Sequence, residues 1–291
     1  MFIDIWTIIN PIIRTFVYII ALYSIGSILF KLHFQKYLND EINFFCNKII
    51  KNSAFLGFLI SILAFISIAG NLGGELKSIF ELELIELSFE TIQGRSTLFL
   101  IVGFSFLSLS FFFPLFLFKI FNILGTILIL TSFVVVGHSL SQGIFSQLLV
   151  LIHIICISFW LGSFLPLRYM CTIKNFTNLY FIADNFGKYA VVYVGILILT
   201  GLTFSYILLG GILPLITSTY GNVLLIKLFI VSMILIIGAI NKFKIVPEIK
   251  KDLTTGQVKL KNSINIEIIS SVLVLFTTSI LTTSLPTPMG M

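Results

Sequence analysis

The chain has 291 residues, of which 58% are hydrophobic and 10% are charged. Soluble domains carry about a quarter of charged residues, so this composition excludes an ordinary globular protein. The apolar runs continue for roughly 18 residues or more and do not alternate with polar residues, as barrel strands would. The sequence therefore predicts an all-α, polytopic membrane protein.

Eight segments are long and apolar enough to cross a membrane. At a rise of about 1.5 Å per residue each can span a hydrocarbon core of roughly 30 Å, although the shorter segments need the residues next to them to complete the span. The third and fourth are separated by Lys119 alone, where we expect a tight turn. The segments are 5–30, 53–69, 96–118, 120–137, 147–167, 189–209, 223–240 and 264–285.

The basic residues between these segments predict the orientation. Fourteen lie in the first, third, fifth and seventh connections, whereas the other side holds Lys77 and Arg95. By the positive-inside rule the odd connections face the cytoplasm, and both termini face the outer side. Because the formal charge of +6 arises from these short connections, it indicates topology and no nucleic-acid partner.

The longest outer connection, 71–95, is acidic. One interpretation is an amphipathic helix on the outer surface; the other is a vestibule whose carboxylates collect cations. Its five glutamates are Glu75, Glu81, Glu83, Glu86 and Glu90.

The chain also contains a weak internal repeat. YSIGSILFKL at 23–32 aligns with FWLGSFLPLR at 159–168, which pairs Gly26 with Gly162. Two four-helix halves of the same orientation, 1–140 and 141–291, would produce this pattern within a single membrane domain.

Three histidines occur, and two of them are expected in the outer half of the membrane. His138 closes the fourth segment, and His153 lies roughly 10 Å into the fifth. Imidazoles at this depth suit copper, zinc or haem iron, or alternatively a hydrogen bond to a neighbouring helix. His33 lies among lysines and is expected to be solvated.

Sulfur donors accompany these histidines. Cys156 and Trp160 follow His153 along one helical stripe, and Met289 and Met291 end the chain on the outer side. Thiols and thioethers suit copper. The alternatives are that Cys156 is a small apolar filler and that the methionines belong to a tail without a ligand.

Two basic residues lie within the apolar segments. Arg14 should have a partner, such as Asp4, another outer carboxylate or a backbone carbonyl, and Lys227 can extend its ammonium towards the outer surface. Nucleotide-binding and hydrolase motifs and paired intramembrane carboxylates are absent from the sequence. We therefore expect no enzyme and no proton-coupled carrier.

Three stretches together resemble the copper resistance protein D family of bacterial inner-membrane proteins, most strongly over 130–250. They are Gly137-His138-Ser139 with His153 and FWLG at 159–162, TSTYGNVLLIKL at 217–228, and Asn241-Lys242-Phe243 with Pro247. The resemblance implies copper uptake from periplasm to cytoplasm, with a small periplasmic copper-binding protein as partner.

Relatives often carry a histidine three residues after the arginine of the first helix, where this chain has Val17. His138 with His153 is therefore the better candidate site.

Three hypotheses follow. In the first, the protein is a copper permease that captures the ion at His138 and His153, with Cys156 as the next donor inward. In the second, it binds haem between the two histidines, as a redox protein or a relative of the membrane protoporphyrinogen oxidases. In the third, it is an accessory membrane subunit without a ligand.

Overall fold

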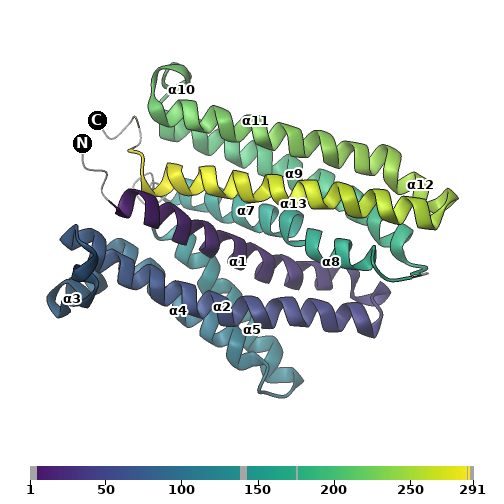
Figure 1. Cartoon of the computed structure of the whole chain (residues 1–291), viewed down its shortest axis with the longest axis horizontal. Coiled ribbons are helices and arrows are strands. Elements are labelled where there is room, and N and C mark those ends of the chain that lie inside the picture. The colour runs from purple at the N-terminus through teal and green to yellow at the C-terminus, as the bar shows by residue number, and fades with distance from the viewer. Residues whose placement is uncertain (1–4, 138–142, 175, 287, 289–291) are drawn as a thin grey trace.

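The computed structural model describes the chain except for residues 1–4, 138–142, 175, 287 and 289–291 (Figure 1). Within the described residues, eight helices are long and apolar enough to cross a membrane, and no strand occurs. The predicted all-α polytopic fold is thereby confirmed. The eight are α1 (Trp6–Phe34), α2 (Asp40–Gly73), α4 (Ile92–Ser110), α5 (Leu115–Val134), α7 (Gly143–Gly162), α9 (Leu179–Leu209), α11 (Thr219–Ile240) and α13 (Leu253–Thr283).

Shorter elements extend or connect these helices. They are η1 (Gln35–Tyr37), η2 (Leu76–Phe80), α3 (Leu82–Glu90), α8 (Phe164–Met170), α10 (Pro214–Thr217), the π-helical η3 (Asn241–Ile245) and α12 (Val246–Lys251). The long helices run side by side, and the start of α1 and the end of α13 lie at the same end of the bundle as α3 and α10 (Figure 1). We call this the terminal end, and the opposite end, with α8 and α12, the lysine-rich end.

The predicted turn at Lys119 is wrong. Helix α4 ends at Ser110, and α5 begins after Pro114, whose backbone is extended at φ −63° and ψ 162°. Proline lacks an N–H and suits the position just before or at the first turn of a helix. Lys119 lies exposed inside α5. Residues 111–113 are apolar, so the hydropathy of the sequence does not show where α4 ends and α5 begins.

Several helices begin earlier than their apolar segments. Helix α2 begins at Asp40 rather than at 53, with the Asn39 side chain accepting a hydrogen bond from the Ile42 N–H. Helix α13 begins at Leu253 rather than at 264, capped by the Asp252 carboxylate. Hydrogen bonds from Thr255 and Thr254 lower the pKa of Asp252 to about 2, so this cap is charged at neutral pH and is lost only as the pH falls towards that value. Polar capping thus lengthens helices beyond the hydrocarbon-spanning part.

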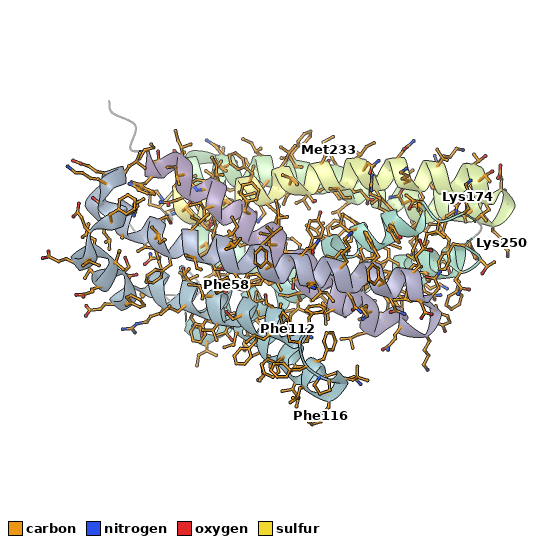
Figure 2. All side chains as sticks on the ribbon, turned by 60° about the horizontal axis from the view of Figure 1, so that its bottom comes forward. Phe58, Phe112, Phe116, Lys174, Met233 and Lys250 are labelled. Carbon is orange, nitrogen blue, oxygen red and sulfur yellow. The ribbon has the colours of Figure 1, made fainter. Side chains whose placement is uncertain are left out.

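The sides of the bundle are apolar. Figure 2 shows Phe112 and Phe116 at the α4–α5 turn and Met233 on α11 directed away from the ribbon, whereas Lys174 and Lys250 lie at the lysine-rich end. Phe112 is 79% exposed and Phe116 is 74% exposed. Such a surface fits lipid and not water.

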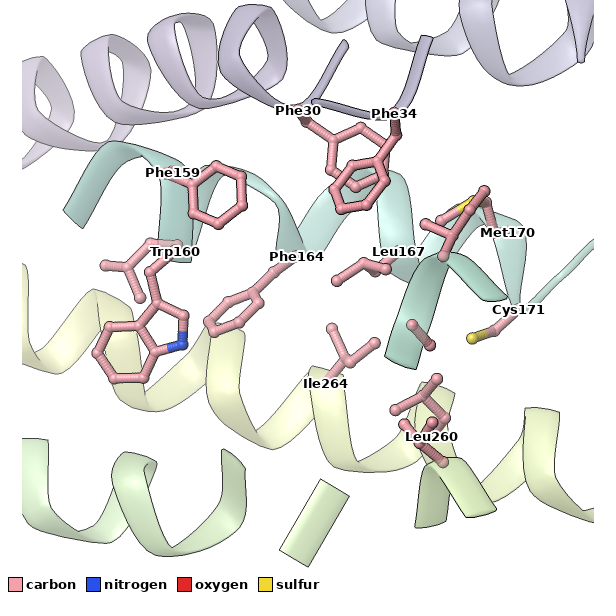
Figure 3. Packing of buried hydrophobic residues seen from close by; sticks show 14 of the residues in the cluster. Phe30, Phe34, Phe159, Trp160, Phe164, Leu167, Met170, Cys171, Leu260 and Ile264 are labelled. Atoms are coloured by element: carbon pink, nitrogen blue, oxygen red, sulfur yellow. The ribbon is translucent and has the colours of Figure 1, made fainter. Parts of the chain in front are cut away.

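The largest core fills the lysine-rich half. Figure 3 shows Phe30 and Phe34 of α1 near Leu167 of α8, with Ile264 of α13 on the other side of that helix. Phe30 and Phe34 are at most 1% exposed. This core fixes α7 and α8 between α1 and α13, and so sets where the side chains of α7 lie.

The glycines paired by the repeat are in direct contact. A Cβ added to Gly26 would lie 2.5 Å from the Gly162 Cα, and one added to Gly162 would lie 2.5 Å from the Gly26 Cα. Helices α1 and α7 therefore cross with their backbones touching, which small residues permit in membrane bundles. The division into two repeated halves stays a prediction; the contact shows that their first helices meet at the aligned positions.

We expect Gly26→Ala to destabilise the bundle by about 1–3 kcal/mol, because the added methyl group would meet backbone atoms that cannot yield. Gly195→Ala is the matched control, since nothing lies within 4 Å of a Cβ added there. Thermal denaturation of the purified proteins in detergent measures the difference. Equal midpoints for the two variants would contradict the close crossing.

The orientation is testable with fused reporters. We expect a reporter after Met291 to be outside, and a reporter inserted within 244–261 to be cytoplasmic, because this segment carries five lysines. Enzymatic reporters active on one side of the membrane distinguish the two. A cytoplasmic signal at Met291 would reverse the orientation or change the number of spans.

Candidate functional site

A cavity of about 500 Å³ opens between the helices at the terminal end, and we call it the terminal cavity. Each of the eight long helices contributes to its wall, so it lies between the two predicted halves. Its lining includes the side chains of Arg14, Tyr18, Gln93, Thr97, His153, Ser205, Tyr220 and Lys227. Among the predicted site residues, His153, Arg14 and Lys227 therefore share one cavity.

His153 is held by helix α9. Its Nδ1 lies 3.3 Å from the Thr200 Oγ1, and Thr200 donates its own proton to the carbonyl oxygen of Ile196 at 2.9 Å. With its proton used in this way, the Thr200 oxygen can accept a hydrogen bond from Nδ1, and in that tautomer Nε2 keeps its lone pair. Gly201 leaves room for the ring, since a Cβ there would lie 3.0 Å from the His153 Cε1. The geometry leaves Nε2 as the nitrogen able to bind a metal.

Arg14 is stabilised by aromatic rings. Its guanidinium carbon lies 5.0 Å from the ring centre of Tyr18 and 5.3 Å from that of Phe133. Within the described part of the chain it forms no ion pair, so an outer carboxylate as its partner is wrong for the described residues. Asp4, the other predicted partner, lies outside them. Cation–π contacts replace the expected ion pair.

Lys227 also lines the cavity and is only partly exposed. It forms no ion pair with any described residue, and no carboxylate occurs among the described residues that line the terminal cavity. The two fixed cations therefore give the cavity a positive potential. This favours an anionic group, or a metal that carries anionic ligands, over a bare cation.

Cys156 and Trp160 do not join His153 in this cavity. Cys156 is 4% exposed and belongs to the core of the lysine-rich half. Trp160 is 5% exposed and lines a second cavity of about 190 Å³, which we call the inner cavity. The predicted stripe along α7 therefore runs from one cavity to the other.

Three predicted ligands, His138, Met289 and Met291, lie outside the described residues. In the described ranges, no group of three or more His, Cys, Asp and Glu side chains is close enough to hold a metal. The described part of the chain thus offers one imidazole to the terminal cavity.

The prediction that His33 is solvated is wrong. Its Nδ1 lies 2.8 Å from the Leu29 carbonyl oxygen, and its Nε2 lies 3.3 Å from the Tyr193 hydroxyl group. Its ring also contacts Phe159 and Tyr189. Helix α1 continues past the apolar segment, which places His33 against α7 and α9 and not in a loop.

The acidic segment forms η2 and the surface helix α3. All five of its glutamates are exposed, and none lines the terminal cavity. Leu82 and Phe89 on α3 are also exposed. Polar and apolar exposed side chains on one short helix agree with the surface-helix interpretation.

Sequence reasoning missed Glu267. It lies on α13 inside the inner cavity, is 2% exposed, and accepts a hydrogen bond of 2.8 Å from the Asn241 Nδ2. The absence of paired carboxylates from the sequence does not exclude a single glutamate within the segment 264–285. A charged residue in an apolar segment is itself a signal for function.

The fold and cavities define a multi-pass membrane protein with a histidine-bearing cavity at one end. Residues 182–281 match the family model described as copper resistance protein D. This match agrees with the family resemblance predicted from the sequence, over a stretch that lies further towards the C-terminus than expected. It contains Thr200, Lys227 and Glu267 but neither His153 nor Cys156. No curated protein and no solved structure matches the chain.

Thiol labelling tests whether the terminal cavity holds water. The three native cysteines are buried, and burial raises the pKa of Cys171 to about 12, so the wild-type protein should react slowly with a maleimide. Ser205→Cys, in the cavity wall, should react fast, whereas Ser232→Cys, exposed on α11 away from both cavities, should not. Equal labelling of the two variants would show that the cavity is dry.

Proposed function

We propose that the protein carries copper across the bacterial inner membrane from the periplasmic side to the cytoplasm, and so contributes to copper homeostasis or resistance. The observation that carries this proposal is the Nε2 lone pair of His153 in the wall of the terminal cavity. Neutral imidazole is a good copper ligand. The match of 182–281 to copper resistance protein D supports the choice of metal.

The path inward follows α7. Cys156 lies about 4.5 Å further along the helix axis than His153, and Trp160 lies about 6 Å beyond that, at the inner cavity. A thiol is a softer donor than imidazole and suits Cu(I). Passage down a gradient needs no nucleotide when each site binds weakly enough to release the ion to the next.

Copper would reach His153 already bound to other ligands. Arg14 and Lys227 repel a bare ion from the cavity, so an anionic complex or a protein donor must deliver it. A small periplasmic copper-binding protein is the proposed partner. His138, Met289 and Met291 are the proposed ligands that receive the ion and bring it to His153.

We expect His153→Ala to lose copper binding while the protein still inserts into the membrane. His33→Gln is the matched control, because this histidine lies at the lysine-rich end in an aromatic setting and lines neither cavity. Copper content per purified protein, measured by mass spectrometry after dialysis against copper, reports the difference. Wild-type copper content in His153→Ala would remove His153 from the site.

Thr200→Val should weaken copper binding by about 10- to 100-fold, because it removes the acceptor that holds the proton of His153 on Nδ1. Titration with a competing copper chelator measures the affinity. Thr203→Val, one turn along α9 and bound to the carbonyl oxygen of Leu199, provides the control. Equal affinities for the two variants would argue against the assigned tautomer.

Haem is the second candidate ligand. The observation in its favour is the pair of cations, Arg14 and Lys227, in a cavity of about 500 Å³, because the two carboxylates of a haem need positive partners. His153, with His138, would supply axial nitrogens. A Soret band in the purified protein that His153→Ala removes would favour haem, whereas a colourless protein with stoichiometric copper would favour the permease.

A further inference from the structure

Glu267 is a carboxyl group in the middle of a membrane helix. It lies 14 residues from the start of α13 and is 2% exposed. Its Oε2 accepts a hydrogen bond of 2.8 Å from the Asn241 Nδ2, and its Oε1 faces Gly238, where an added Cβ would lie 3.5 Å away. Glu267 forms no ion pair with any residue that the structure describes.

No ion pair with a described residue neutralises this carboxyl group in the inner cavity. Helices α7, α8 and α9 contribute apolar side chains and Gly187 to its wall. Lys242 on η3 is the other ionisable group among the described lining residues, and its Nζ lies 5.6 Å from the ring centre of Phe243. From α1, Tyr23 lies near Ser271, one turn along α13 from Glu267. An unpaired carboxylate buried in this way is too costly to stay charged, so the neutral acid is the stable form.

Asn241 provides an independent sign of a proton. It is 8% exposed, and its Oδ1 has no hydrogen-bond partner, although its Nδ2 is used on Glu267. The pair of Asn241 and Glu267 therefore contains one hydrogen-bond acceptor, the Asn241 Oδ1, for which no donor is present among the described residues. A carboxylic acid and a primary amide are complementary in donors and acceptors, so the protonated form of Glu267 suits a pair with a spare acceptor better than the carboxylate does. One proton thus removes the buried charge and adds a donor to the pair.

The backbone at this point is also unusual. Asn241 begins the π-helical turn η3, where one extra residue is inserted between α11 and α12. Such turns are rare and are often found at functional sites. The insertion places the Asn241 amide against α13 at the wall of the inner cavity, which runs along α13 from Glu267 to Leu260 towards the lysine-rich end.

We propose that Glu267 is a reversible proton-binding site, held by Asn241 and reached through the inner cavity, and that the protein moves protons as it moves copper. The bound proton leaves as the carboxylate forms and returns when the acid is restored, so no other reactant is needed. The proton site stands on the geometry of the pair. The coupling to copper rests on the proposed function.

Infrared spectroscopy tests the proton site without copper. We expect the purified protein in lipid at neutral pH to show the C=O band of a protonated carboxyl group, and Glu267→Gln to lose it. Glu248→Gln is the matched control, because Glu248 lies outside the apolar core and pairs with Lys259 at 2.7 Å. A spectrum of Glu267→Gln identical to that of Glu248→Gln would overturn the proton site.

Proteoliposomes with an internal pH dye and a copper gradient test the coupling. We expect copper entry into wild-type vesicles to change the internal pH, and Glu267→Gln to abolish that change while it keeps wild-type copper binding. His153→Ala should lose copper binding and keep the infrared band. Copper entry without a pH change in the wild-type protein would overturn the coupling. If copper does not enter at all, the proposed function fails, and the infrared band alone decides whether Glu267 holds a proton.

Discussion

The arrangement depends on the contact between Gly26 and Gly162. Lipid gives no hydrophobic force that drives one helix onto another, so close packing of backbones at small residues must supply the attraction. Here α1 and α7 touch at these glycines. Nine residues towards the terminal end, about 13 Å along the axes, Val17 and His153 both line the terminal cavity. The crossing thus brings equivalent positions of the two predicted halves to one cavity, and only one of the two carries a metal-binding side chain.

Charge is distributed unevenly between the two cavities. The terminal cavity contains Arg14 and Lys227 with no carboxylate among its described residues, whereas the inner cavity contains Lys242 together with the carboxyl group of Glu267, proposed to be protonated, and the amide of Asn241. A cation entering from the terminal end therefore meets repulsion before it meets a ligand, and a carboxyl group further in. In a medium of low dielectric constant such fixed charges act strongly over several ångströms. In the proposed function, ligands would thus select the ion as much as charge does.

The sequence predicted the eight spans and the family well, because both depend on patterns that extend over many residues. Hydropathy could not locate the turn before Pro114, since the residues at the turn are as apolar as those of the helices. Hydropathy also placed the starts of α2 and α13 too late in the sequence, because the first turns of these helices are stabilised by the capping residues Asn39 and Asp252. For the site, the sequence identified His153 but grouped it with Cys156 and Trp160. Helical spacing shows which residues share a stripe, whereas packing against α9 and α13 decides which cavity each one reaches.

A single imidazole from the described residues suits a carrier better than a storage site. Ligands that enclose a metal completely hold it tightly and release it slowly, whereas passage requires each site to bind weakly enough to let the ion move on. Val17, at the position equivalent to His153, halves the number of imidazoles that a symmetric site would have. The remaining ligands would then have to come from whatever delivers the ion or from the ends of the chain. Thr200 and Gly201 contact the ring of His153 from one side, at Nδ1 and Cε1, and the residue lines the cavity. The fold thus keeps one imidazole in a cavity of about 500 Å³, in which the proposed copper complex would exchange its partners.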